Sequence, residues 1–251
     1  MTPPNSTSGT HIVTSFADEL NSVESLLLEM GALVEDQLRN ATQALRSEDR
    51  DLAKSVLRND GRINDLEAEI NDTALRILAL RQPVAIDLRT VVMSVKIARH
   101  LERVGDYAKN MARRTNTITK AEAFTGSVGT MARMSELVQA MVRNALDAYG
   151  RRDAALAEQV RVDDEQVDLM HNTVFEKLVN YMMAAPENVG GAIHLLLIAR
   201  NLERMGDHVA DVAMETIYMV TGKWPETKRP KGDRTSRMIL ELDPDADPGD
   251  G

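Results

Sequence analysis

The stretch IARHLERVGDYAKNMA at residues 97–112 occurs a second time as IARNLERMGDHVADVA at residues 198–213. The two copies share the core I-A-R-x-L-E-R-x-G-D. A self-match this dense indicates a tandem duplication, which constrains the fold before any single element is assigned. In both copies apolar residues recur every three or four positions, the pattern of an amphipathic helix with one buried face. The repeat therefore predicts two copies of one helical unit.

Each copy also carries carboxylates on the side of the helix away from its apolar stripe. Glu102 and Asp106 are four residues apart, and the same step joins Glu203 to Asp207 and Asp207 to Asp211. Side chains at this spacing are neighbours about 5–6 Å apart, so like charges repel. Two arrangements offset the repulsion. Arginines three residues before every one of these acids except Asp211 give a solvated, salt-bridged face, whereas a bound cation uses carboxylate oxygens, which suit Mg, Ca, Mn or iron.

The same spacing recurs in the preceding helix of each repeat. Asp164 and Asp168 in the second repeat have Asp60 and Asn64 as their counterparts. Because Asn64 and Asn110 stand where an acid would complete the pattern, the second repeat is the more complete cation site. The candidate metal ligands are Asp60, Glu102, Asp106, Asp164, Asp168, Glu203, Asp207 and Asp211.

The histidines add little to these candidates. A di-iron bundle needs Glu-x-x-His on two helices, and the chain has no such motif. The nearest approach is Asp168-x-x-His171, in which His171 is either an auxiliary ligand or an ordinary surface residue. His208 lies between Asp207 and Asp211 in sequence, and the helical period assigns it to a different face of the helix.

The composition and the absence of common motifs argue against several classes of ligand and activity. The 251 residues carry a formal charge of −9, which argues against DNA phosphate as a ligand, and 3% aromatic residues argue against stacking on single-stranded nucleic acid. There is no cysteine, which fits the reducing cytoplasm. The sequence shows neither a signal peptide nor a membrane span. Without a phosphate-binding loop, a dinucleotide fingerprint or a zinc-protease motif, we expect a cytoplasmic protein that is not an enzyme.

The periodicity predicts an all-α fold of six long helices, arranged as a tandem repeat of two antiparallel three-helix bundles. Ser15 in a capping-box pattern, Ser47 or Asp49, and Asp153 are the expected helix starts. The predicted organisation is a flexible N-terminus at residues 1–13, a first bundle at 14–118, a second at 126–222 and a disordered acidic tail at 223–251.

These features together resemble the PhoU family of bacterial phosphate-signalling regulators over roughly residues 16–222. The resemblance rests on the doubled L-E-R-x-G-D motif at residues 101–106 and 202–207. It also rests on Pro83-x-x-x-Asp87-Leu88-Arg89 and on Asp60-x-x-x-Asn64-x-x-Glu67.

The resemblance implies two similar three-helix bundles with multinuclear iron or zinc clusters on their acidic motifs, and Mg or Mn is a further candidate at such sites. It also implies a cytoplasmic adaptor between the ATPase-driven Pst-type phosphate transporter and a PhoR-type histidine kinase, which holds the phosphate-starvation response off. Membrane contact then comes only through partners, and a homodimer is expected because long bundles with exposed faces often pair.

Two other functions stay open at this point. One is a structural helical-bundle scaffold whose acidic faces are solvated and free of metal. The other is a metal-dependent hydrolase of a phosphorylated substrate, although no general base or nucleophile stands out beside the candidate ligands.

Overall fold

The computed structural model describes residues 7–118 and 124–237, with side chains from Phe16 onward. In that part of the chain every regular element is a helix. The elements are α1 (Thr7–Ser47), α2 (Arg50–Asn59), α3 (Gly61–Arg81), α4 (Ala85–Thr115), α5 (Thr125–Arg151), α6 (Ala154–Ala184), the 3-10 turn η2 (Pro186–Asn188), α7 (Val189–Thr221) and the 3-10 turn η3 (Thr235–Arg237).

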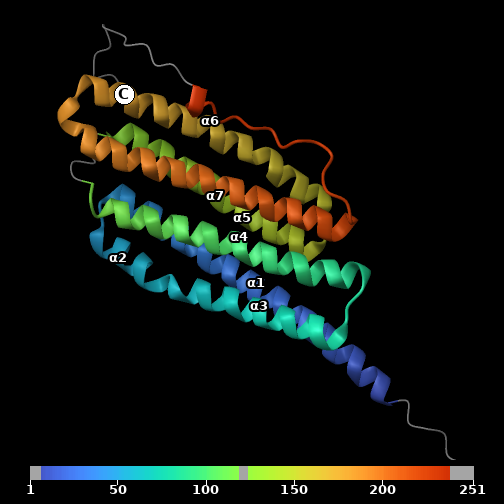
Figure 1. The fold of residues 1–251 in the computed structure, drawn as a ribbon. Coiled ribbons are helices and arrows are strands. Elements are labelled where there is room, and N and C mark those ends of the chain that lie inside the picture. The colour runs from blue at the N-terminus through green and yellow to red at the C-terminus, as the bar shows by residue number, and fades with distance from the viewer. Residues whose placement is uncertain (1–6, 119–123, 238–251) are drawn as a thin grey trace, which may run out of the picture.

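The helices form the two predicted bundles. α1, α4 and the α2–α3 pair make up the first repeat, and α5, α6 and α7 make up the second (Figure 1). α4 lies against α7 and α1 against α5, so the buried side chains of both repeats form one continuous core. Among the described helices, none combines the length and the apolar composition that crossing a lipid bilayer requires.

The second helix of the first repeat differs from its prediction as a single element. It is interrupted at Asp60, between α2 and α3, whereas α6 runs unbroken past the counterpart Asp164. Glycine is among the poorest helix formers, and Gly61 follows the break where Glu165 continues α6. The interruption is slight, because Asp60 keeps a right-handed helical conformation and its carbonyl accepts from the amide of Ile63 at 3.2 Å.

The start of α1 also differs from its prediction. The backbone is helical from Thr7, not from the Ser15 capping box, so residues 7–13 of the N-terminus expected to be flexible are helical, and residues 1–6 lie outside the described part. Extending an existing helix adds one hydrogen bond per residue fixed, whereas a new nucleus is costly. The long α1 can therefore continue toward the N-terminus past a local start signal.

The turn that opens the second helix of each repeat is duplicated in detail. Asp49 accepts hydrogen bonds from the amides of residues 51 and 52, and Asp153 accepts them from residues 155 and 156, all at 2.9–3.0 Å. The residue before each cap, Glu48 or Arg152, has a positive φ of 53° or 56°. Asp153 is confirmed as a cap, and Asp49 rather than Ser47 starts α2.

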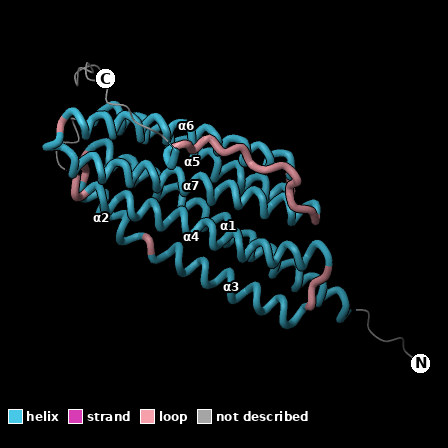
Figure 2. Tube along the Cα trace, turned by 45° about the horizontal axis from the view of Figure 1, so that its top comes forward, coloured by secondary structure: helices cyan, strands magenta, loops and turns pink. Residues whose placement is uncertain are grey.

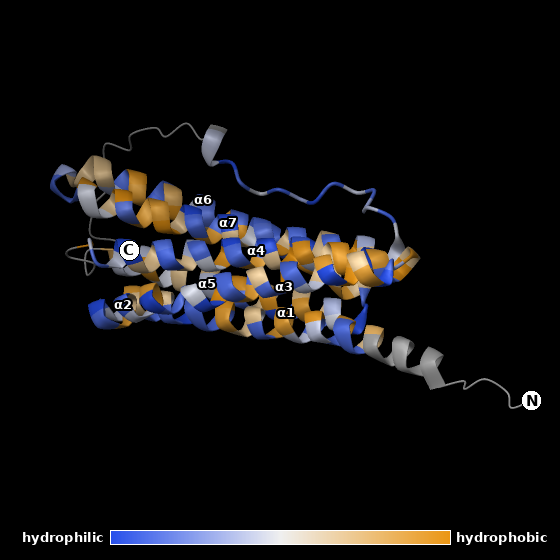
Figure 3. Ribbon diagram, turned by 60° about the horizontal axis from the view of Figure 1, so that its bottom comes forward, coloured by the Kyte–Doolittle hydropathy of each residue, from blue (hydrophilic) through white to orange (hydrophobic). Residues whose placement is uncertain are grey.

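The chain after α7 is not the featureless tail that its prolines and charges predicted. From Lys223 to Arg237 it turns back and runs along α6 and α7 as an extended, hydrophilic segment (Figures 2 and 3). We call residues 223–237 the C-terminal strap. Arg229, Lys231 and the amide of Gly232 bind acidic side chains of the bundle, and hydropathy and helix-breaking residues do not predict such contacts. Residues 238–251 of the predicted tail lie outside the described part.

We expect Asp153→Ala to lower the free energy of unfolding by about 1 kcal/mol, because two amides of the first turn of α6 lose their acceptor. Urea denaturation followed by circular dichroism measures the change. Asp153→Asn is the matched control, since asparagine caps helices as well as aspartate does. Equal losses in the two variants would contradict the assignment of Asp153 as the cap.

Candidate functional site

The second repeat gathers four of the predicted ligands into one cluster. Asp164 and Asp168 come from α6, and Glu203 and Asp207 come from α7. We call these four residues the second acidic face. Gly206 lets the two helices approach, because a Cβ at that position would lie 2.6 Å from Asp164 Oδ1. The glycine that interrupts the repeated motif therefore leaves room for a carboxylate of the neighbouring helix.

These carboxylates are buried, so the reading of a solvated face does not hold for them. Asp164, Asp168 and Glu203 are each at most 3% exposed. Burial raises the pKa of Asp164 to about 7, with the charge of Arg229 opposing the shift and those of Asp168 and Asp207 adding to it. Burial and the charge of Asp207 likewise raise the pKa of Glu203 to about 7. A single-helix projection misses this burial, since α6 and the C-terminal strap cover the acidic side of α7.

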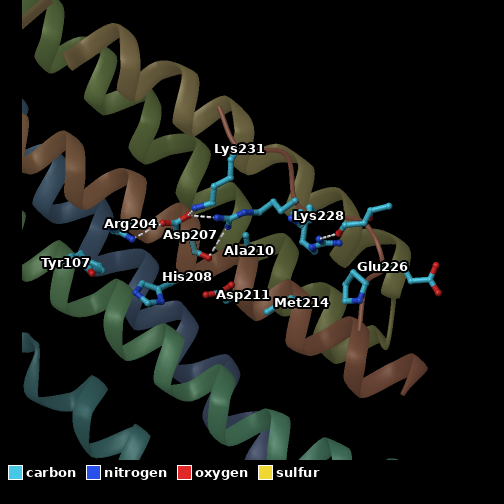
Figure 4. A pocket seen from close by; sticks show the side chains of 14 residues that line it. Tyr107, Arg204, Asp207, His208, Ala210, Asp211, Met214, Glu226, Lys228 and Lys231 are labelled. Carbon is cyan, nitrogen blue, oxygen red and sulfur yellow. Dashed lines mark hydrogen bonds and ion pairs between the residues drawn. The ribbon is translucent and has the colours of Figure 1, made fainter. Parts of the chain in front are cut away.

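The C-terminal strap brings positive charge to this cluster. Arg229 Nη1 lies 3.1 Å from Asp164 Oδ2, and Arg229 also donates a short hydrogen bond to Asp207. Lys231 Nζ donates to the same Asp207 oxygen at 3.1 Å (Figure 4). Burial alone would raise the pKa of Asp207, but the Lys231 hydrogen bond and the Arg229 charge outweigh it and lower that pKa. Two basic side chains of the strap thus act as counter-ions of the second acidic face.

Further contacts anchor the strap beside these two cations. The amide of Gly232 donates to Asp168 Oδ2 at 2.8 Å, and a Cβ on Gly232 would lie 3.1 Å from Asp168 Cβ. Asn172 bonds the strap twice, from its amide to the carbonyl of Gly232 and from the amide of Arg234 to its carbonyl. Asp233 pairs with Arg200 at 3.1 Å. The glycine permits the close approach of the strap to α6.

His171 is not the surface residue that one reading predicted. It is 2% exposed, and its Nδ1 lies 3.6 Å from Asp233 Oδ1 on the strap. Burial lowers its pKa, and the charge of Asp233 opposes that shift. His171 lies one helical turn after Asp168, as its spacing predicts, but its ring nitrogen faces Asp233 of the strap.

The first repeat balances its carboxylates within its own helices. Lys109 bonds Asp60 closely and lies 3.8 Å from Asp106 Oδ1, while Arg99 Nη1 lies 2.9 Å from Glu102 Oε2. Asp60, Glu67, Glu102 and Asp106 together are the first acidic face. Burial and the neighbouring Asp106 raise the pKa of Glu102.

Asp211 does not join Asp207 and the rest of the second acidic face. Its Oδ2 lies 3.9 Å from Nδ1 of His100 on α4, and His100 Nδ1 lies 3.1 Å from Nδ1 of His208. In Figure 4 Asp207 points toward the strap, whereas the carboxylate of Asp211 lies toward His208. The prediction that His208 and Asp211 occupy different faces is wrong, because residues three apart on a helix are neighbours. Burial lowers the pKa of both histidines.

A pocket of about 670 Å³ lies between α7 and the strap, beside the contacts of Arg229 and Lys231 with Asp207. Asp207, His208 and Asp211 line it on α7, and Arg161 lies on α6. Basic residues 228, 229 and 231 face them from the strap. The pocket therefore opens toward Asp207 of the second acidic face and toward His208. Sequence reasoning missed the strap side, although the run Lys228-Arg229-Pro230-Lys231 was the available signal.

Comparison with known proteins gives consistent results. A sequence model described as the PhoU domain matches residues 27–115 and again residues 131–216, one match in each repeat. The phosphate-specific transport system accessory protein PhoU homolog of Caulobacter vibrioides (strain NA1000 / CB15N) is 38% identical over 227 residues, covering 90% of this chain and 99% of that protein. Its homolog in Rhizobium meliloti (strain 1021) is 36% identical over 228 residues, covering 91% and 96%.

Solved structures show the same fold. The crystal structure of PhoU from Pseudomonas aeruginosa has a TM-score of 0.78 to this chain at 38% identity, covering 83% of this chain and 100% of that one. The phosphate transport system regulatory protein PhoU from Streptococcus pneumoniae has a TM-score of 0.77 at 27% identity, covering 84% and 100%. Both likenesses extend over most of the two bundles.

We expect Glu203→Gln to raise the free energy of unfolding of chelator-treated protein at pH 8 by about 3.5 kcal/mol. The pKa of Glu203 is about 7 in the folded protein and about 4.3 in unfolded chains. Between these values the folded state binds more protons, so stability falls as pH rises. The variant should flatten that fall, which urea denaturation at several pH values between 4 and 8 measures.

Asp207→Asn, one turn further along α7, is the control with the opposite sign. The folded pKa of Asp207 is lowered, so its charge stabilises the fold above its unfolded value of about 3.9 and loses that effect as pH falls through the folded pKa. The variant should lose stability at pH 7 and little at low pH. A loss at pH 8 in both variants would contradict this account of the second acidic face.

Proposed function

Because this chain belongs to the PhoU family, we propose that it is a regulatory adaptor between a Pst-type phosphate ABC transporter and a PhoR-type sensor histidine kinase. In this function it holds the phosphate-starvation response off while phosphate is sufficient. The observation that carries the proposal is the match of both repeats to the PhoU domain, with relatives named accessory proteins of phosphate-specific transport over nine-tenths of the chain.

The surface supports a protein that works through partners. Large apolar side chains are exposed where α3 turns into α4, and such patches mark interaction sites. The residues concerned are Leu75, Leu80, Val84, Ile86 and Leu88, which are 40–73% exposed. We assign the chain to the cytoplasm, as a homodimer that meets the membrane only through the transporter. Its role is regulatory rather than catalytic.

Deleting the gene in a bacterium that encodes this chain should switch on the phosphate-starvation response in phosphate-rich medium. A phosphate-regulated reporter measures that response, and affinity purification of the tagged protein should recover the transporter ATPase and the kinase. Complementation with the full-length gene is the control. A reporter that stays repressed, with neither partner recovered, would favour the structural scaffold instead.

We further propose that the second acidic face holds iron or zinc, with Mg or Mn as alternatives. The donors suit an ion with oxygen ligands, because neither Asp164 oxygen is hydrogen-bonded and Glu203 Oε2 is also without such a partner. When bound, the metal would neutralise the buried carboxylates that Arg229 and Lys231 now balance. The first acidic face, with Asp60, Glu102 and Asp106, is the second candidate.

Metal and strap should compete. In purified protein, Glu203→Ala combined with Asp207→Ala should abolish stoichiometric iron or zinc at this face, as measured by elemental analysis. Arg229→Ala combined with Lys231→Ala should raise metal affinity, because two cations no longer occupy the carboxylates. Glu102→Ala with Asp106→Ala is the matched pair for the first acidic face. Equal metal content in the wild type and all three variants would leave both faces as salt-bridged structure.

A further inference from the structure

We propose that His100, His208 and Asp211 form a binding site for a transition-metal ion of the zinc class at the seam between the two repeats. His100 belongs to α4 in the first repeat, and the other two residues belong to α7 in the second. Each of the three offers a ligand atom, and these atoms all lie within 4.8 Å of one another. The site shares no histidine with the acidic faces and does not rest on the proposed adaptor function.

The distances suit a small ion. A tetrahedral zinc ion with ligands at about 2.0–2.1 Å holds two nitrogens about 3.3 Å apart. The Nδ1 atoms of His100 and His208 are 3.1 Å apart, and Asp211 Oδ2 is 3.9 Å from the first of them. The Asp211 carboxylate has to approach the His100 nitrogen by about half an ångström, and it lies within 4.8 Å of a His208 ring nitrogen. Two imidazole nitrogens and one carboxylate oxygen are a donor set that zinc and its first-row neighbours accept.

The two helices hold these donors rigidly and leave one side open. His208 and Asp211 are three residues apart on α7, so they share a face, and α4 is packed along that face. Tyr107 stacks on His208 with ring centroids 5.8 Å apart. The side chains of His100 and Asp211 are 22% and 42% exposed, and the pocket beside the strap reaches His208 and Asp211. An ion therefore has an entry path and room for a water as fourth ligand.

The surrounding charges do not exclude a cation. The positive charges of Lys96 and Arg99 act on His100, and that of Arg103 acts on His208. Lys96 is paired with Glu215 at 3.2 Å, and Arg99 with Glu102 at 2.9 Å. Asp207 and Asp211 act on His208 with the opposite sign. Most of the neighbouring positive charge is thus already balanced.

The duplication offers an internal comparison. In the repeated helix the counterparts of His208 and Asp211 are Tyr107 and Asn110, and the counterpart of His100 is Asn201. Tyr107, Asn110 and Asn201 therefore supply no imidazole and no carboxylate at the three equivalent positions. Since both copies build the same helix and pack in the same seam, helix packing alone does not require the His-His-Asp set.

The experiment uses the full-length protein after chelator treatment. Titration with Co²⁺ reports a tetrahedral nitrogen and oxygen site through visible d–d absorption, and competition of Zn²⁺ against a chromophoric chelator gives the affinity. We expect one equivalent at this site in the wild type. His100→Asn and His208→Asn should each weaken it by at least about tenfold, because even second-shell changes cost that much. Asn201→Ala is the matched control and should bind like the wild type.

The acidic faces are separated from this site by a second control, Glu203→Gln with Asp207→Asn, which should retain the Co²⁺ absorption. Thermal unfolding checks folding: metal-free variants should melt cooperatively, and zinc should raise the melting temperature of the wild type but not of His208→Asn. The proposal is overturned if the wild type shows no Co²⁺ absorption or zinc binding. It is equally overturned if the histidine variants bind zinc as tightly as the wild type, which would leave a hydrogen-bonded histidine pair.

Discussion

The structure depends on supplying positive charge to carboxylates that the helix packing has buried. The repeated motif places acids on the side of α4 and α7 that faces a neighbouring helix, so their hydration is lost while their mutual repulsion is retained. Each repeat must meet this electrostatic cost, and the two repeats meet it differently. In the first, Lys109 of α4 bonds Asp60 and lies close to Asp106.

In the second repeat the counterpart of Lys109 is Ala210, so α7 has no lysine at that position, although its Arg204 donates to Asp207 Oδ2 at 3.4 Å. Arg229 and Lys231 occupy that role from the C-terminal strap, bridging Asp164 and Asp207 as Lys109 bridges Asp60 and Asp106. Where the first repeat has Lys109, the second has Ala210, and the strap residues Arg229 and Lys231 supply the positive charge instead. The counter-charges of the second acidic face thus lie on a segment outside the helices, whereas Lys109 belongs to α4 itself.

Most of the fold could be predicted from the sequence, because it follows from local physics. The three-to-four-residue period of apolar side chains, the caps Asp49 and Asp153 and the internal repeat each depend on neighbours in the chain. The grouping of Asp164 and Asp168 with Glu203 and Asp207 also followed from the repeat. The strap contacts and the union of His100 with His208 depend on which surfaces meet across long chain separations. A helical projection shows one helix and not which surfaces of different helices meet. For the same reason it groups Asp211 with Asp207 and not with His100 and His208.

The two acidic faces differ in where their counter-ions come from. The first acidic face is closed by cations of its own bundle, so a ligand gains little by displacing them. The second acidic face has carboxylate oxygens without a hydrogen bond from the described residues, two carboxyl groups with a pKa of about 7, and counter-ions on a separate segment. Binding or release of protons therefore changes the charge of this face near neutral pH. Because α7 also forms the seam with α4, a change of charge on the strap side of α7 lies one helix away from the first repeat.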